Sequence, residues 1–373
     1  MKKIKSSRRI FLEKMTAGGV ALAISASISE KLFAGRYRQP VPRTEPERRG
    51  WMNGTDKKFV PVMITPFDAK GKIDFEVLNR LIEFYLAAGV RGFFANCLSS
   101  EMYNLTEEER LSLATHVVKK VNGSVPVVAS GSFGETIEDK AEFAKKMYHT
   151  GVNAVILITS HYAKVDESDD VLFRNFEKMC ILTDNIPLGF YECPSPYKRV
   201  ITPDLFKSLL ETNRLVYYKD TSIDLEKIKA KLALIKNNRI EFYDAHTPNA
   251  MYSLQMGAKG MSAIAGNFYP EILVWMCNHA TNPDKQEDVK WLQSELTKAD
   301  PIISRHYPLS AKYFMHKRGL PIRVISRMST TELSTTEKQA LDDIHNTLMG
   351  WCQRLEIQPT RASFRSRLKE VQS

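Results

Sequence analysis

The chain has 373 residues, enough for one large domain with additions, and its 43% hydrophobic and 26% charged residues are an ordinary balance for a globular protein. The net charge of +10 suggests nucleic acid, but residues 1–50 hold 12 Lys/Arg against 4 Asp/Glu, and residues 354–373 hold 5 against 2. The intervening chain carries a net charge of −1 and offers no basic face, which excludes nucleic acid as the expected partner.

The 5 cysteines are widely spaced and include no CxxC pair, which excludes a disulfide scaffold and a zinc ribbon. Most of them are expected to be buried as small apolar side chains. The 8 histidines form no HExxH motif or paired-ligand spacing. The sequence therefore predicts neither a metal site nor a bound cofactor.

Residues 1–34 are predicted to be a twin-arginine-type export signal. Lysines precede the run Ser7-Arg8-Arg9-Ile10-Phe11-Leu12, and the apolar stretch that follows, Ala17 to Ile24, is too short to span a bilayer. A basic amphipathic tail is the alternative. We expect a periplasmic or otherwise exported protein with no stable membrane span, and a proline- and arginine-rich linker over residues 35–57.

From residue 58 onward, short apolar runs alternate with longer segments of helical period. The expected strands are Phe59–Thr65, Val90–Cys97, Val125–Ser132, Ala154–Thr159, Pro187–Cys193, Leu215–Ser222, Ile240–Ala245 and Gly260–Ala265. Their near-continuous apolar character is typical of parallel strands buried on both faces. Eight β–α units over residues 58–282 predict an α/β fold, a (β/α)8 TIM barrel.

The helices between the strands carry their own start signals. Thr106 and Glu109 form a capping box, Thr136 precedes Asp139 in the same way, Ser168 is an expected N-cap, and Thr202-Pro203 places proline at the first helical position. A doubly wound sheet is the alternative fold. It would need a glycine-rich phosphate loop after the first strand, and residues 65–68 (Thr-Pro-Phe-Asp) are not one.

Additional C-terminal helices are predicted over residues 283–357, at Gln286–Ala299, Leu309–Arg318 and Thr336–Leu355, followed by a basic tail over residues 358–373.

The chemistry is expected where the barrel strands end, because functional side chains gather at the carboxyl ends of the strands. Lys219 ends the sixth strand and Tyr191 ends the fifth. A lysine desolvated there has a lowered pKa, so its neutral amine attacks a keto acid to form an imine, and a nearby tyrosine moves the protons. A structural Lys219 paired with Asp220 is the alternative.

Further candidates follow the first and second strands. Thr65 ends the first strand, and Leu98-Ser99-Ser100 forms a turn after the second. The hydroxyl and backbone N–H groups of that turn are suited to hold a substrate carboxylate, so Ser99, Ser100 and Thr65 are expected substrate-binding residues. Ala263 at the eighth strand is expected beside them, and Glu101 is expected to be a structural hydrogen-bond acceptor.

Taken together, the motifs resemble the dihydrodipicolinate synthase / N-acetylneuraminate lyase family over about residues 58–325. The ordered set is Asn96-Cys-Leu-Ser-Ser-Glu101, Thr159-Ser-His-Tyr162, Tyr191-Glu-Cys-Pro194, Lys219-Asp-Thr and Gly257-Ala-Lys-Gly260. The resemblance implies a barrel-shaped class I aldolase that acts on pyruvate or a related 2-keto acid and assembles as a dimer or tetramer. It implies Lys219 as the Schiff-base lysine, Tyr191 as the proton-transfer tyrosine, Ser99 as a carboxylate-binding hydroxyl, and Tyr162 as a relay or interface residue.

Two departures from the family pattern refine the expectation. Leu98 takes the place of a hydroxyl residue in the usual Gly-[Thr/Ser]-Thr-Gly-Glu turn, and Pro196 takes the place of the arginine that dihydrodipicolinate synthases use for a second carboxylate. The expected function is therefore a lyase or aldolase for a 2-keto acid, with a sugar-derived substrate as one option, rather than dihydrodipicolinate synthase itself. The alternatives are an exported barrel that binds a keto acid or sugar acid without turnover, and a keto-deoxy sugar acid dehydratase that uses the same imine.

Overall fold

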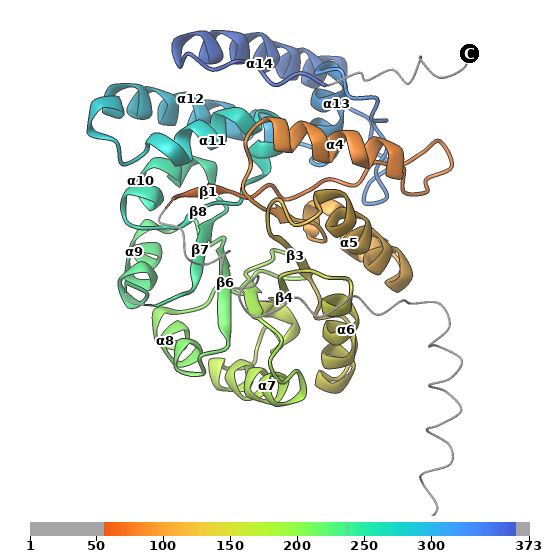
Figure 1. The fold of residues 1–373 in the computed structure, drawn as a ribbon, viewed down its shortest axis with the longest axis vertical. Helices are drawn as coiled ribbons and strands as arrows, with labels where there is room; N and C mark the ends of the chain where they lie inside the picture. Colours follow the sequence, from red (N-terminus) through yellow and green to blue (C-terminus); the bar gives the residue numbers. More distant parts are fainter. Residues whose placement is uncertain (1–55, 237, 363–373) are drawn as a thin grey trace, which may run out of the picture. The chain divides into compact units, whose positions relative to one another are not determined.

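The computed structural model describes residues 56–236 and 238–362, so the predicted export signal and most of the linker and basic tail lie outside the described residues. Eight parallel strands form one sheet in the order β1-β8-β7-β6-β5-β4-β3-β2 (Figure 1). The strands are β1 (Lys58–Phe59), β2 (Phe93–Phe94), β3 (Val127–Ser130), β4 (Ala154–Ile158), β5 (Leu188–Tyr191), β6 (Leu215–Asp220), β7 (Glu241–Asp244) and β8 (Gly260–Met261).

The sheet closes into a barrel at its first strand. Strand β1 pairs with β8, and beyond β1 a parallel bridge joins Val62 to Phe94 of β2. The backbone N–H of Met63 donates to the carbonyl of Phe94 at 3.1 Å. The predicted (β/α)8 barrel is confirmed and the doubly wound alternative is wrong. The first strand is shorter than predicted, and Pro61, which has no N–H for the ladder, follows it closely.

Eight helices surround the strands. They are α4 (Phe75–Ala87), α5 (Glu107–Val121), α6 (Ile137–His149), α7 (Asp169–Leu182), α8 (Pro203–Glu211), α9 (Leu225–Leu234), α10 (Ala250–Gln255) and α11 (Pro270–His279). The capping boxes at Thr106 and Thr136 and the Thr202 cap before Pro203 are confirmed. Ser168 occupies the N-cap position of α7, but its side chain makes no capping hydrogen bond.

Three further helices pack together beside the barrel, as predicted: α12 (Gln286–Ser304), α13 (Leu309–Lys317) and α14 (Thr335–Arg354) (Figure 1). Helix α12 runs past its expected end at Ala299 despite Pro301. Its last turn buries Ile303 completely, and this packing favours helix beyond the proline. Within residues 56–236 and 238–362, no helix has the length and apolar character needed to cross a bilayer.

Side chains separate into two apolar clusters because successive residues of a strand point to opposite faces. The inner cluster fills the barrel with residues such as Phe94, Ile156, Tyr191 and Tyr217. The outer cluster lies between strands and helices and includes Phe190 and Tyr218. Odd-numbered residues at the end of β6 therefore face the barrel interior, which places Lys219 inside.

Substitution of Gly260 tests whether the close pairing of β1 with β8 is needed to close the barrel. A Cβ at this position would lie 1.8 Å from the carbonyl oxygen of Lys58, so Gly260→Ala must push β1 away from β8. We expect a loss of about 2–4 kcal/mol in the free energy of unfolding, measured by urea denaturation. Gly350→Ala is the control: this helical glycine has open space around it, and alanine there should be neutral or stabilising. Equal stability of the two variants would contradict the closure argument.

Candidate active site

Lys219 lies inside the barrel on β6, and its residue is only 3% exposed. Its backbone pairs with that of Tyr191 on β5. The Nζ atom lies 4.3 Å from the centroid of the Tyr191 ring and 5.6 Å from that of Phe94. Aromatic faces interact favourably with an ammonium group but do not supply a counter-charge. The structure therefore places Lys219 beside Tyr191, as the sequence predicts.

Within the described part of the chain, no carboxylate pairs with Lys219. Burial lowers the pKa of its amine to about 8, and the thiols of Cys97 and Cys193 offset this only in part. Desolvation disfavours the charged form of a buried lysine, so a useful fraction of the amine is neutral near neutral pH. A neutral amine is the form that attacks a carbonyl carbon.

Tyr191 provides a hydroxyl group that can donate a proton during the reaction. It ends β5 and is 4% exposed, and burial raises its pKa well above the usual range. Its hydroxyl interacts with the thiol of Cys193, which in turn interacts with the hydroxyl of Tyr103. The tyrosine stays neutral, so it has a proton to give. Cys193 was expected only to pack, although its spacing of two residues from Tyr191 puts both side chains on one face of an extended strand.

The turn after β2 is a short 3-10 helix, η1 (Leu98–Ser100), held by hydroxyl groups of the barrel. The Ser100 Oγ atom lies 2.7 Å from the carbonyl oxygen of Met63 and 2.9 Å from that of Ala95, and it accepts from the N–H of Cys97 at 3.1 Å. Thr65 Oγ1 donates to the carbonyl of Ser100 at 2.8 Å. The Ser100 and Thr65 hydroxyls therefore bind backbone groups and fix the turn.

Ser99 differs from its neighbour because its side chain bonds none of these backbone groups. The residue is 5% exposed, and its hydroxyl partly offsets the rise that burial causes in the pKa of Tyr307, a residue that precedes α13. Sequence analysis missed Tyr307, because nothing in the pattern of residues 286–318 shows that the connection between two helices reaches the barrel. Of the predicted carboxylate-binding residues, Ser99 keeps the most freedom to bind a substrate.

The two remaining predicted site residues lie in different surroundings. Ala263 is buried at the start of a 3-10 turn, η5 (Ile264–Asn267), and its carbonyl accepts from Gly266 N–H at 3.3 Å. Tyr162 is 1% exposed and belongs to the outer cluster, where its ring contacts that of Phe190. Its hydroxyl has no partner among the described residues. The structure therefore does not bring Tyr162 to Lys219 within one chain.

Glu101 fixes the end of the turn from the side of the C-terminal helices. Its backbone is left-handed at φ 61°, and its carboxylate accepts from Lys312 Nζ at 2.5 Å and from the N–H of Arg327 at 2.5 Å. Both side chains of the Glu101–Lys312 pair are fully buried. The expectation that Glu101 is a structural acceptor is confirmed.

Strand alternation turns Asp220 away from Lys219 and into a buried polar network between the strands and α9. Lys231 of α9 donates to Asp220 Oδ2 and to Glu192 Oε1, each at 2.7 Å, and to the Tyr218 hydroxyl at 3.0 Å. Both ion pairs are fully buried. The alternative that Asp220 pairs with Lys219 is therefore wrong.

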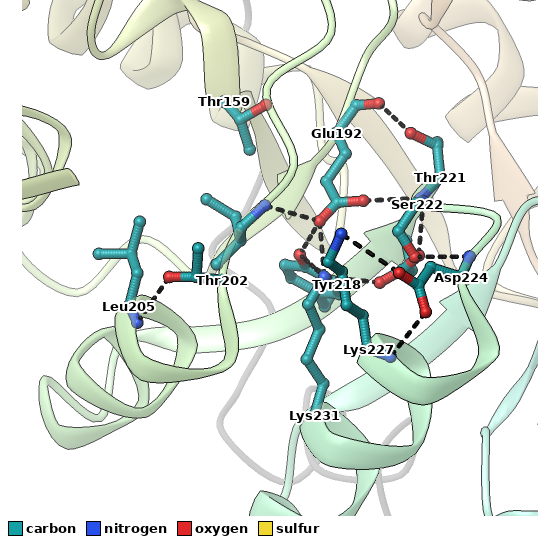
Figure 2. A network of polar contacts seen from close by, with 12 residues as sticks. Thr159, Glu192, Thr202, Leu205, Tyr218, Thr221, Ser222, Asp224, Lys227 and Lys231 are labelled. Atoms are coloured by element: carbon teal, nitrogen blue, oxygen red, sulfur yellow. Dashed lines mark hydrogen bonds and ion pairs between the residues drawn. The ribbon is translucent and has the colours of Figure 1, made fainter. Parts of the chain in front are cut away.

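Glu192 also joins the loop after β5 to the end of β6. Its carboxylate accepts from the N–H of Thr221 at 2.8 Å (Figure 2) and from that of Ile201 at 2.9 Å. It follows Tyr191 as Asp220 follows Lys219, so the network holds the outer side of both site strands. Lys231 was missed, although a sequence signal exists: it sits three residues after Ile228 on the apolar face of α9.

The geometry can be compared with known proteins. A model of the dihydrodipicolinate synthetase family matches residues 56–348. The chain belongs to the dihydrodipicolinate synthetase family. A 4-hydroxy-tetrahydrodipicolinate synthase of Oceanobacillus iheyensis is 28% identical over 267 residues, which cover 71% of this chain and 85% of that protein. The corresponding enzyme of Bacillus subtilis is 27% identical over 282 residues, covering 75% and 94%.

Solved structures of the family share the fold. A crystal structure of a dihydrodipicolinate synthase has a TM-score of 0.69 at 25% identity and covers 79% of this chain and 99% of its own. A prophage protein of this family from E. coli, solved in complex with pyruvate, has a TM-score of 0.70 at 21% identity, covering 81% and 99%. The family consists of lyases and synthases that make or break carbon–carbon bonds, and this chain is a member of that class.

The loop after β5 carries Pro196, the position at which sequence analysis noted the absence of an arginine. Pro196 is exposed, and the next arginine, Arg199, uses its two terminal nitrogens in hydrogen bonds, while its Nε atom has no partner among the described residues. Its guanidinium donates to the carbonyls of Lys164 and Glu167 at 2.9 Å each, and to the carboxylate of Asp169 at 2.9 Å. Arg199 therefore anchors a neighbouring loop.

The buried network gives a test of stability. Burial and Asp220 raise the pKa of the Glu192 carboxyl, and Lys231 opposes them. Lys231→Met leaves two buried carboxylates without a cation, so we expect a loss of about 3–5 kcal/mol in the free energy of unfolding at pH 8. A carboxyl whose folded pKa is raised binds a proton more readily in the folded state, so the loss should shrink as the pH falls.

Urea denaturation at pH 6 and pH 8 measures both effects. Lys227→Met is the matched control, because Lys227 is half-exposed on the same helix and contacts Asp224 at 3.2 Å. An exposed pair contributes little, so this variant should stay within about 1 kcal/mol of the wild type. A Lys231→Met loss as small as this, or independent of pH, would contradict the network argument.

Proposed function

We propose that the protein is a class I lyase or aldolase that forms a Schiff base between Lys219 and pyruvate or a related 2-keto acid. The observation that supports this most directly is the unpaired, buried amine of Lys219 with a pKa of about 8 beside the Tyr191 ring. A buried lysine without a counter-ion is costly to a fold, and such cost is typical of functional sites.

The reaction follows from the groups in place. The neutral Nζ of Lys219 attacks the keto carbon, and the carbonyl oxygen takes up a proton to give a carbinolamine. Tyr191 donates a proton to the departing hydroxyl, which leaves as water, and a protonated imine remains. This imine withdraws electrons from the neighbouring carbon, so a carbon–carbon bond there is cleaved or formed. The imine is itself the electron sink, so the proposal requires no metal or other cofactor.

The substrate has one carboxylate that the site is suited to hold. The turn carrying Ser99 provides the hydroxyl for it, next to the interior where Lys219 lies. Pro196, with Arg199 bound to the neighbouring loop before α7, gives no basic group for a second carboxylate at the position where dihydrodipicolinate synthases place one. We therefore propose a monocarboxylic 2-keto acid, with a sugar-derived acid as one option, rather than the substrates of dihydrodipicolinate synthase.

Leu98 favours a second candidate function, the binding of a keto acid without turnover. It occupies the turn position where the family pattern has a hydroxyl that serves the proton-transfer tyrosine. Without that hydroxyl, a barrel could bind a keto acid at Lys219 and release it unchanged. Turnover of a keto acid, rather than imine formation, separates a binding protein from an aldolase or from a dehydratase that uses the same imine.

The place and assembly of the protein are also proposals. The Ser7-Arg8-Arg9-Ile10-Phe11-Leu12 run supports export, and the relatives' biosynthetic reaction uses cytoplasmic substrates, which fits a different role for this chain. A homodimer or homotetramer would give Tyr162 a partner subunit to approach. Size-exclusion chromatography with light scattering measures the assembly directly.

Borohydride trapping tests the imine. Wild-type protein mixed with pyruvate and sodium borohydride should gain the mass of one reduced pyruvyl group per chain, located at Lys219 by peptide mass spectrometry. Lys219→Ala should gain none, because it has no amine to attack the ketone. Lys231→Arg, which keeps a cation in the outer network, is the control and should still be trapped. A wild-type protein that is folded but never trapped by any 2-keto acid would overturn the proposal.

The pKa of Lys219 predicts the pH dependence of trapping. Only the neutral amine attacks, so the initial rate at low pyruvate should rise about tenfold per pH unit below pH 8 and level off above it. The measurement is the rate of adduct formation from pH 6 to pH 9.5 at constant ionic strength. A rate that keeps rising to pH 10, as for an exposed lysine, would show that burial does not lower the pKa of this amine.

A further inference from the structure

The backbone pairing of β5 with β6 ends at the two residues proposed to carry the chemistry. Tyr191 lies opposite Lys219 in the last register pair, and the N–H of Glu192 donates to the carbonyl of Lys219 at 3.2 Å. The chain then turns away, since the N–H of Cys193 donates back to the carbonyl of Tyr191 at 2.8 Å. If nothing else joined the two strands here, both site residues would lie at a strand end that opens easily.

Side chains continue the connection one residue further. The carboxylate of Glu192 accepts from the N–H of Thr221 at 2.8 Å, and the Thr221 hydroxyl donates to the backbone carbonyl of Glu192 at 2.6 Å (Figure 2). The same carboxylate accepts from the N–H of Ile201, which precedes α8. Glu192 is therefore fixed both to the end of β6 and to the far end of the loop that follows β5.

The hydrogen bonds around Glu192 require a carboxylate at this position. Four donors point to its two oxygens: the N–H groups of Ile201 and Thr221, the hydroxyl of Tyr218, and the ammonium of Lys231. The ammonium is itself saturated, because its three hydrogens have three acceptors, at 2.7, 2.7 and 3.0 Å. A glutamine would replace one of the two accepting oxygens by an NH₂ group that only donates, so it cannot serve all four donors.

The location of this network favours a role in geometry. Glu192 and Lys231 are fully buried, and apolar residues of the same volume often stabilise a fold as well as a buried ion pair does. Here the ion pair lies directly beside the strand pair that carries Tyr191 and Lys219. Reacting groups must be held within about 0.5 Å of their working positions, and a displacement of about 1 Å lowers a rate about a hundredfold.

We propose that Glu192 is a positioning residue that, through its bonds to Thr221, holds the Tyr191 hydroxyl where it can protonate the hydroxyl that leaves the carbinolamine at Lys219. The inference rests on the proposed function and deepens it. It assigns a part in imine formation to a side chain that lies on the outer side of the barrel wall and touches no substrate.

Glu192→Gln and Thr221→Val test the inference by borohydride trapping. The rate at saturating pyruvate should fall about tenfold to a hundredfold in Glu192→Gln, because Tyr191 is displaced. Thr221→Val loses a single hydroxyl and should fall about threefold to tenfold. The half-saturating pyruvate concentration should stay within about twofold in both, since the turn after β2 is untouched. Thr221→Ser, which restores the hydroxyl, should recover the wild-type rate.

A double-variant cycle shows whether Glu192 acts through Tyr191. Tyr191→Phe removes the proton donor and should slow trapping at saturating pyruvate. Adding Glu192→Gln to Tyr191→Phe should then cause a much smaller loss than Glu192→Gln causes in the wild type, because no hydroxyl is left to position. Two losses that multiply would overturn the inference.

The pH dependence of trapping separates positioning from two other effects. The wild-type profile should have its midpoint near pH 8, and a displaced Tyr191 lowers the plateau without moving this midpoint. Loss of a negative charge that acted on the Lys219 amine would lower the midpoint, and water entering a loosened site would raise it. Either shift with an unchanged plateau would overturn the inference. Thr221→Val repeats the measurement without a change of charge.

Glu271→Gln is the matched control. The Glu271 carboxylate is also buried and accepts from a cation, Arg318, and from the N–H of Thr360, each at 3.0 Å, but it lies on α11. This variant should lose stability without slowing trapping. If the wild type is trapped and Glu192→Gln keeps the full rate, the positioning inference is wrong and the lyase proposal stands. If the folded wild type is trapped by no 2-keto acid, both are wrong.

Discussion

The site depends on the separation of the Lys219 amine from the neighbouring carboxylates. The strand geometry of β6 achieves this, because Lys219 faces the barrel interior and Asp220, the next residue, faces α9. Asp220 and Glu192 then share one cation, Lys231, on the outer side, at 2.7 Å each. The carboxylates nearest in sequence to the site are thus committed elsewhere. Burial is the largest influence on the pKa of Lys219, and a single carboxylate on the inner face would raise this pKa and reduce the fraction of reactive amine.

The C-terminal helices pack beside the barrel and also supply a side chain that holds the turn after β2. Lys312 of α13 binds Glu101 and so holds one end of the η1 turn. Loops at the carboxyl ends of barrel strands usually adapt such a fold to its substrate. Here part of that adaptation comes from a segment more than two hundred residues later in the chain.

The sequence predicted what depends on local pattern. Eight apolar runs separated by capped helices gave the barrel, and the ends of two neighbouring strands gave Lys219 and Tyr191. What escaped prediction depends on contacts between distant residues: Asn267 orients Tyr307, and Lys231 meets Glu192 across two elements. The end of α12 was missed because burial of Ile303 favours helix beyond Pro301. Strand ends were placed too late because the apolar runs continue into loops that are themselves buried, as at Thr65 and Ser132.

The Glu101–Lys312 pair has a consequence for the order in which the molecule becomes functional. During synthesis, residues 58–280 can emerge and close eight strands while α13 is still inside the ribosome. Such an intermediate would already hold the amine of Lys219 in place, yet Glu101 would lack Lys312 and the N–H of Arg327, so only the Thr65 and Ser100 hydroxyls would hold the η1 turn. The Lys219 amine and the η1 turn are thus completed in separate steps. The turn is completed only after the last fifth of the polypeptide has been synthesised.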